Sequence, residues 1–93
     1  MKLYRHVNGK CNISGTAIRE LREAAGLSQE QLAARLQLAG LSLNQKAVSR
    51  IETGDRVVPD FELLYFAQVF NVSIHRLFGK DLDPIITIFP DKL

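Results

Sequence analysis

Four polar side chains follow one another closely in the stretch NQKAVSRIETG, which covers residues 44–54. Gln45 and Lys46 come first, and Ser49 and Arg50 come about one helical turn later, so a helix places all four on one side. Their amide, ammonium, hydroxyl and guanidinium groups are well suited to hydrogen bonding. Two interpretations fit this pattern: the solvent-exposed end of an otherwise buried helix, or a helix that presents this side to a partner.

The other side of the same stretch is apolar, with Ala47, Val48 and Ile51 at helical spacing. These residues are expected to hold the helix against a core. The pattern therefore favours a division of labour, in which one face packs against the protein and the other face reads a partner.

The start of this helix has two candidate caps. Asn44 is a good N-cap, and Gly54 is expected to end the helix. Ser42 is an alternative cap, with Gln45 as its partner in a capping box. If Ser42 were the cap, Gln45 would be partly occupied, and the polar residues from Lys46 onward would be the main readers.

The chain has 93 residues and a net charge of +2, with a pI near 8.9. This length supports one compact domain with one modest core, and 46% hydrophobic residues are sufficient to build it. The small positive charge is compatible with a polyanionic partner but does not by itself indicate one.

Residues with catalytic or metal-binding chemistry are few. Cys11 is the only cysteine, and His6 and His75 lie far apart in the sequence, so no metal-ligand spacing or disulfide is expected. No nucleophile, base and orienting group recur together, so we expect neither an enzyme nor a cofactor. No apolar run has the length of a signal peptide or a membrane span, which favours a cytoplasmic protein without membrane contact.

Apolar spacing and capping residues predict five helices, and hence an all-α fold. Their expected ranges are about 16–25, 28–39, 44–53, 60–70 and 73–78. The expected N-caps are Ser14, Ser28, Asn44, Asp60 and Ser73. The Ser28 cap has Gln31 three positions later, which predicts a capping box. Glycines follow four of these five helices.

Three segments in one order carry a resemblance to a known family. They are IRELREAAGLSQEQLAARL, NQKAVSRIETG and VVPDFELLYFAQVFNVSIHRLFG, and together they cover most of residues 18–79. This pattern resembles the phage-repressor and Cro type of helix-turn-helix regulator, the XRE family. The resemblance implies a compact five-helix, lambda-repressor-like domain that places its third helix in the major groove of DNA, usually as a dimer.

The resemblance also assigns roles to residues of this chain. In a helix that enters the groove end-first, the first turn reads base edges; glutamine pairs with adenine, and lysine with guanine. The second helix points its N-terminus at a phosphate. The DNA-binding residues implied are Ser28, Gln29, Asn44, Gln45, Lys46, Ser49, Arg50 and Arg56. Arg22 and Glu52 match an ion pair between the first and third helices.

One departure from the family pattern concerns the linker before the third helix. The segment QLAGLSL between Leu36 and Asn44 is longer than usual by about five residues. Leu41 and Leu43 are expected to fill the gap. Because the extra length changes how the third helix is attached, its docking angle is an open question.

The chain is expected to divide into an N-terminal arm (1–13), the helix-turn-helix domain (14–79) and a C-terminal tail (80–93). The tail contains PIITIFP, a β-branched and aromatic run that favours an extended segment. Such a run needs a partner, and a second subunit is the favoured one. The leading hypothesis is a sequence-specific repressor that binds double-stranded DNA. The alternative is the antitoxin of a toxin–antitoxin pair, in which the tail captures a protein partner.

Overall fold

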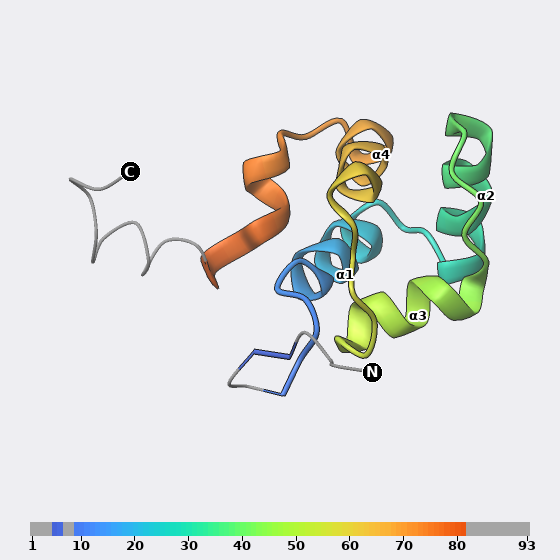
Figure 1. Ribbon diagram of the computed structural model, residues 1–93. Coiled ribbons are helices and arrows are strands. Elements are labelled where there is room, and N and C mark those ends of the chain that lie inside the picture. The colour runs from blue at the N-terminus through green and yellow to red at the C-terminus, as the bar shows by residue number, and fades with distance from the viewer. Residues whose placement is uncertain (1–4, 7–8, 82–93) are drawn as a thin grey trace.

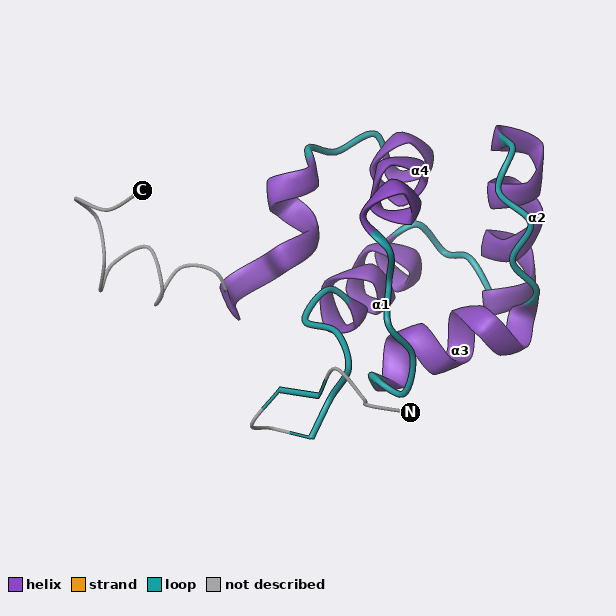
Figure 2. Ribbon diagram, in the orientation of Figure 1, coloured by secondary structure: helices purple, strands orange, loops and turns teal. Residues whose placement is uncertain are grey.

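The structure is a computed structural model that describes residues 5–6 and 9–81. Four α-helices and a 3₁₀ element make up this part of the chain, which contains no strand (Figures 1 and 2). Their bounds are α1 Gly15–Ala24, α2 Gln29–Ala39, α3 Gln45–Thr53, α4 Asp60–Phe70 and η1 Ile74–Asp81. The expected all-α class with five helical elements is confirmed. The segment 84–90, expected to be extended, lies outside the described residues.

The caps of α2 and α3 follow the sequence pattern. Ser28 Oγ accepts a hydrogen bond from Gln31 N at 3.0 Å, and Ser28 N donates to Gln31 Oε1 at 2.8 Å, which completes a capping box. Asn44 Oδ1 accepts from Ala47 N at 2.8 Å, so α3 begins at Gln45. The alternative cap at Ser42 is therefore wrong, because the chain is still extended at Asn44.

Of the caps expected for α1 and α4, the first is at its expected position without its bond, and the second is wrong. Ser14 is the N-cap residue of α1, but it is buried in a helical conformation and its side chain makes no capping bond; Asn12 Oδ1 instead accepts from Gly15 N at 2.8 Å. Asp60 is the first residue of α4, with Pro59 at the N-cap position. Pro59 is non-helical, with a ψ of 150°, and makes no side-chain capping bond; Asp60 in the first turn stabilises the positive end of the helix dipole.

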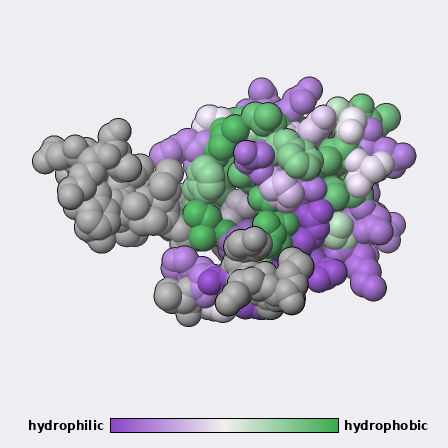
Figure 3. Space-filling view, viewed as in Figure 1, coloured by the Kyte–Doolittle hydropathy of each residue, from purple (hydrophilic) through white to green (hydrophobic). Residues whose placement is uncertain are grey.

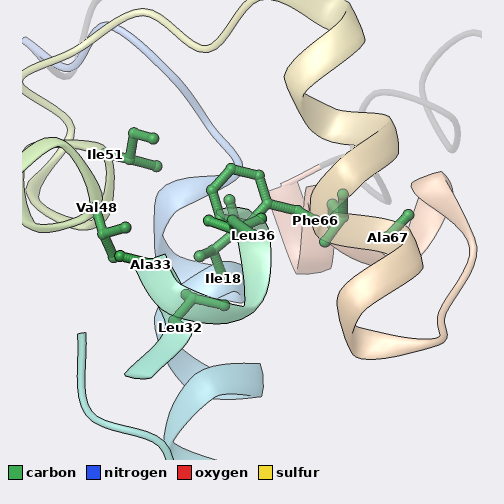
Figure 4. Packing of buried hydrophobic residues seen from close by; sticks show 9 residues of the cluster. Ile18, Leu32, Ala33, Leu36, Val48, Ile51, Phe66 and Ala67 are labelled. Carbon is green, nitrogen blue, oxygen red and sulfur yellow. The ribbon is translucent and has the colours of Figure 1, made fainter. Parts of the chain in front are cut away.

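The core lies where α1, α2, α3, α4 and η1 meet (Figure 4). Its fully buried side chains are Ile18, Leu32, Leu36, Val48, Ile51, Phe66 and Leu77. Burying one such side chain contributes about 1.5–3 kcal/mol. Two of these residues, Val48 and Ile51, belong to α3, so the core holds the apolar face of this helix in place.

The linker from Gly40 to Asn44 runs back along α2 before α3 begins (Figure 1). Five extended residues span about 17 Å, and α2, with its 11 residues, is about 16 Å long. Leu41 and Leu43 are half-buried against the core, as expected. The extra linker residues therefore bring the N-terminus of α3 beside the N-terminus of α2.

The start of α1 touches the end of α3. Gly15 lies so close to α3 that a Cβ atom there would stand 2.1 Å from the Ile51 carbonyl oxygen. Asn12 Nδ2 donates to the carbonyl oxygens of Ile51 at 3.0 Å and Arg56 at 2.7 Å. Cys11 N also donates to Gly54 O at 2.7 Å. This junction fixes the C-terminal end of α3 on the scaffold.

Candidate nucleic-acid interface

The polar side of α3 is turned away from the core. Gln45, Lys46 and Arg50 are exposed, and Ser49 is half-buried. Val48 and Ile51 on the opposite side are fully buried. The two faces expected from the sequence therefore exist, and the exposed one carries an amide, a hydroxyl and two cations.

A line of side chains connects the first residue of α3 with the interior. Gln45 Nε2 donates to Gln29 Oε1 at 2.6 Å, and Gln29 Nε2 donates to Glu52 Oε1 at 3.0 Å. We call Gln45, Gln29, Glu52 and Arg22 the amide relay. It brings the first residues of α2 and α3 together, as the returning linker allows.

Arg22 and Glu52 form an ion pair between α1 and α3. Arg22 Nε lies 2.7 Å from Glu52 Oε2, and Arg22 Nη2 lies 3.1 Å from Glu52 Oε1. A third bond runs from Arg22 Nη1 to the Leu27 carbonyl at 2.7 Å. Only 3% of the Glu52 side chain is exposed. The bond to Glu52 raises the pKa of Arg22 above its usual value, so the guanidinium stays charged.

The first turn of α2 is the second expected contact region. Ser28 Oγ and Ser28 N are engaged in the capping box, and Gln29 belongs to the amide relay. Helix geometry leaves the first-turn amides of Gln29 and Glu30 without an intrahelical acceptor. These amides and the helix dipole favour an anion there, whereas the Glu30 carboxylate in the same turn opposes one.

Arg56 has partners inside the protein. Its Nη1 and Nη2 atoms bind the two carboxylate oxygens of Glu62 at 2.7 and 3.0 Å, and Nη1 also donates to Val57 O at 3.1 Å. The bond to Glu62 raises the pKa of Arg56. The sequence presents Arg56 as a loop cation, but the structure shows it stabilising the buried carboxylate of α4.

Sequence reasoning missed three residues that position this surface: Asn12, Gly15 and Glu62. Asn12 lies in the segment expected to be a loose arm, and its partners Ile51 and Arg56 are about forty residues away. No local pattern indicates such a contact. Glu62 is an acid on a helix with an apolar stripe, where a buried charge implies a cation nearby.

The described part of the chain has few features of a metal site, a reactive thiol or a membrane span. Residues 5–6 and 9–81 contain no group of three His, Cys, Asp or Glu side chains placed to hold a metal ion. The Cys11 thiol is free and half-buried. None of the described helices has the length and apolar character needed to cross a bilayer.

Comparisons with known proteins agree with this arrangement. The model of a helix-turn-helix domain family matches residues 15–77. The crystal structure of the restriction-modification controller protein C.AhdI from Aeromonas hydrophila matches with a TM-score of 0.61 and 35% identity, over 70% of this chain and 87% of that chain. The comparison with curated proteins gives no match. The chain therefore belongs to the helix-turn-helix family, as a transcriptional regulator of the XRE/Cro type.

Proposed function

We propose that this regulator represses transcription by binding a short operator with α3 in the major groove. The observation that supports this most is the start of α3, where Gln45 and Lys46 are exposed while the helix is fixed from behind by its core residues and the amide relay. The major groove admits one α-helix, and its base pairs present distinct donor and acceptor patterns. A helix held in this way reads those patterns with its first turn.

Each residue of the surface takes a role that suits its chemistry. Gln45 pairs with adenine, and Lys46 and Arg50 donate to guanine O6 and N7. Ser49, half-buried between them, contacts the groove wall or a base edge. The remaining members of the interface act near phosphates: Ser28, Gln29, Asn44 and Arg56. Arg56 contributes least in this group because Glu62 already occupies its guanidinium.

The match with C.AhdI supports a role in gene regulation, because that protein is described as a restriction-modification controller. By extension, we assign this chain to the control of a small set of genes through one operator.

The antitoxin alternative depends on capture of a protein by the tail. Residues 82–93 of the tail lie outside the described residues, and no described contact favours that alternative.

A regulator that reads an operator with two-fold symmetry acts as a dimer. We assign the contact with a second copy to an apolar patch of three exposed side chains: Val57 in the loop before α4, and Phe61 and Leu64 three residues apart on α4, with exposed fractions of 42, 55 and 57%. Hydrophobic residues gather over the middle of the face shown in Figure 3, and polar ones dominate its lower right edge, where α3 lies in Figure 1. A dimer through this patch leaves the polar face of α3 free for DNA.

Selection of bound sequences from a random pool of duplexes tests the function. The expected result is one enriched motif with two symmetric half-sites about one helical turn apart. Equal affinity for selected and random duplexes at the same salt concentration contradicts the proposal. Affinity for the selected duplex should also fall steeply with salt, because contacts to phosphates release counterions.

Alanine variants of the reading residues sharpen the test. Lys46→Ala and Arg50→Ala should each weaken binding to the selected operator by about 1–3 kcal/mol and relax the preference at one base pair. Arg35→Ala is the matched control, because Arg35 is an exposed cation beside Leu38 and Val69, between α2 and α4. Titration of a labelled duplex measures all three. Equal losses for Arg35 and Lys46 would mean that only the net charge matters.

A further inference from the structure

We propose that buried Glu52 determines which base Gln45 prefers, by fixing the orientation of the Gln45 side-chain amide. This inference rests on the proposed function and deepens it. Glu52 does not reach the surface, with 3% of its side chain exposed. It acts through Gln29, which links it to Gln45. Glu52 and Gln29 are therefore positioning residues for base recognition.

The chemistry of the amide relay allows one order of donors and acceptors. An ionised carboxylate only accepts hydrogen bonds. Gln29 must therefore turn its NH₂ group toward Glu52, at 3.0 Å, and its carbonyl oxygen toward Gln45. Gln45 must then donate to that oxygen, as it does at 2.6 Å. Arg22 donates to both oxygens of the same carboxylate, at 2.7 and 3.1 Å, so both oxygens act as acceptors and the order does not reverse.

This order leaves Gln45 with a defined outer edge. One N–H is used on Gln29, and the amide presents its second N–H and its carbonyl oxygen to the groove. Adenine offers an acceptor at N7 and a donor at N6, which matches this pair of groups. Guanine offers two acceptors, at N7 and O6, and leaves the glutamine oxygen without a donor. A glutamine free to rotate its amide discriminates less between the two.

Replacing Glu52 by glutamine should reverse the whole relay. Glu52 Oε2 accepts from Arg22 Nε at 2.7 Å, whereas Oε1 accepts from both Gln29 Nε2 at 3.0 Å and Arg22 Nη2 at 3.1 Å. The oxygen of the introduced amide should keep the shorter bond to Arg22 Nε. Its NH₂ group then replaces Oε1, gives up the longer bond from Nη2 and donates to Gln29. Gln29 then turns its oxygen inward and its NH₂ group toward Gln45. Gln45 in turn presents two donors to the groove, which suits guanine.

The experiment compares operator duplexes that carry adenine or guanine at the base pair read by Gln45. That base pair is the one at which Gln45→Ala loses its preference. The unmodified protein should bind the adenine duplex about tenfold or more tightly, the lower part of the range for a bidentate contact. Glu52→Gln should lower the adenine-to-guanine ratio of affinities by about tenfold or more, and so level or invert it.

Two further variants separate orientation from loss of structure. Arg22→Lys weakens the ion pair but keeps the Glu52 carboxylate, so affinity should fall while the ratio stays the same. Gln29→Met cuts the relay, so the ratio should fall toward one without inversion. If Glu52→Gln does not fold, these two variants decide.

A ratio unchanged in Glu52→Gln or in Gln29→Met overturns the inference, as does a ratio that falls equally in Arg22→Lys. The proposed function fails in a different way, through a lack of sequence selection by the unmodified protein. A wild-type protein that selects an operator but shows no adenine preference at the Gln45 position also overturns the inference.

Discussion

At the scale of residues, the two bidentate ion pairs of the described chain serve the scaffold. Arg22–Glu52 joins α1 to α3, and Arg56–Glu62 joins the loop after α3 to α4. In each pair the carboxylate is the buried partner, with 3 and 6% of its side chain exposed. Removing the cation would leave a buried charge uncompensated, which costs more than the loss of an exposed pair.

Arg56→Ala should therefore destabilise the protein by about 3 kcal/mol, mainly because it leaves Glu62 buried and unpaired. Arg19→Ala is the matched control. Arg19 pairs with Glu23 on the surface of α1 at 3.4 Å, and both side chains are more than half exposed. Its removal should change the free energy of unfolding by less than about 0.5 kcal/mol. Urea denaturation measures both free energies of unfolding. Equal effects of the two variants would show that another group compensates the buried charge of Glu62.

The sequence predicts some of these side chains and not others. The polar face of α3 follows from helical spacing, which depends only on near neighbours in the chain. The Arg22–Glu52 pair was expected because the resemblance supplies a partner thirty residues away. For Arg56 no such guide exists, since its bond to Glu62 depends on the course of the loop between α3 and α4.

At the scale of elements, helix ends were predicted best where a side chain caps the helix itself. The capping box of Ser28 and the cap of Asn44 require only residues three positions apart, so the sequence indicates both. At the start of α1 the sequence indicates the N-cap residue Ser14 but not the side chain that makes the bond, because Asn12 combines a local capping bond with two distant ones to α3 and the following loop. Tertiary contacts of this kind leave no periodic pattern in the sequence.

Gly15→Ala tests the contact between α1 and α3. Alanine is the better helix former by about 1 kcal/mol, yet the added methyl group would meet the Ile51 carbonyl. The clash should prevail and destabilise the protein by about 1–3 kcal/mol. Because α3 must move, affinity for the operator should fall as well.

Gly9→Ala provides the comparison, since a Cβ atom at Gly9 meets nothing within 4 Å. Its φ of +82° adds a strain of about 1 kcal/mol without a collision. It should therefore leave operator affinity unchanged. Thermal unfolding and duplex titration of both variants measure these effects. A Gly15→Ala protein with unaltered stability would show that the two helices are less closely packed.

At the scale of the whole molecule, two regions of the described surface differ in chemistry. The N-termini of α2 and α3 carry polar side chains proposed to bind DNA, and Val57, Phe61 and Leu64 form the apolar patch proposed to bind a second copy. Leu38 is another exposed apolar residue, with an exposed fraction of 89%, near the C-terminal end of α2. It is not part of the proposed dimer surface and therefore serves as a control.

Phe61→Glu should convert a dimer into monomers, because it places a charge in an apolar contact that is desolvated on association. Leu38→Glu should leave the dimer intact. Sedimentation equilibrium at several protein concentrations distinguishes the two states. A monomeric wild-type protein, or equal effects of both variants, would assign self-association to another surface. Phe61→Glu should also lose affinity for a two-half-site operator far more than for a single half-site.

In this fold, the length of the linker that returns along α2 depends on the length of α2 itself. Because Gly40–Asn44 must cover the length of α2 before α3 can begin, a longer α2 would demand a longer linker. One helical turn adds about 5.4 Å, which an extended chain covers with about two residues. An insertion of about six residues should be tolerated when about four of them lengthen α2 and about two lengthen the linker. An insertion or deletion of a single residue would instead pull Gln45 away from Gln29 and weaken binding to the operator.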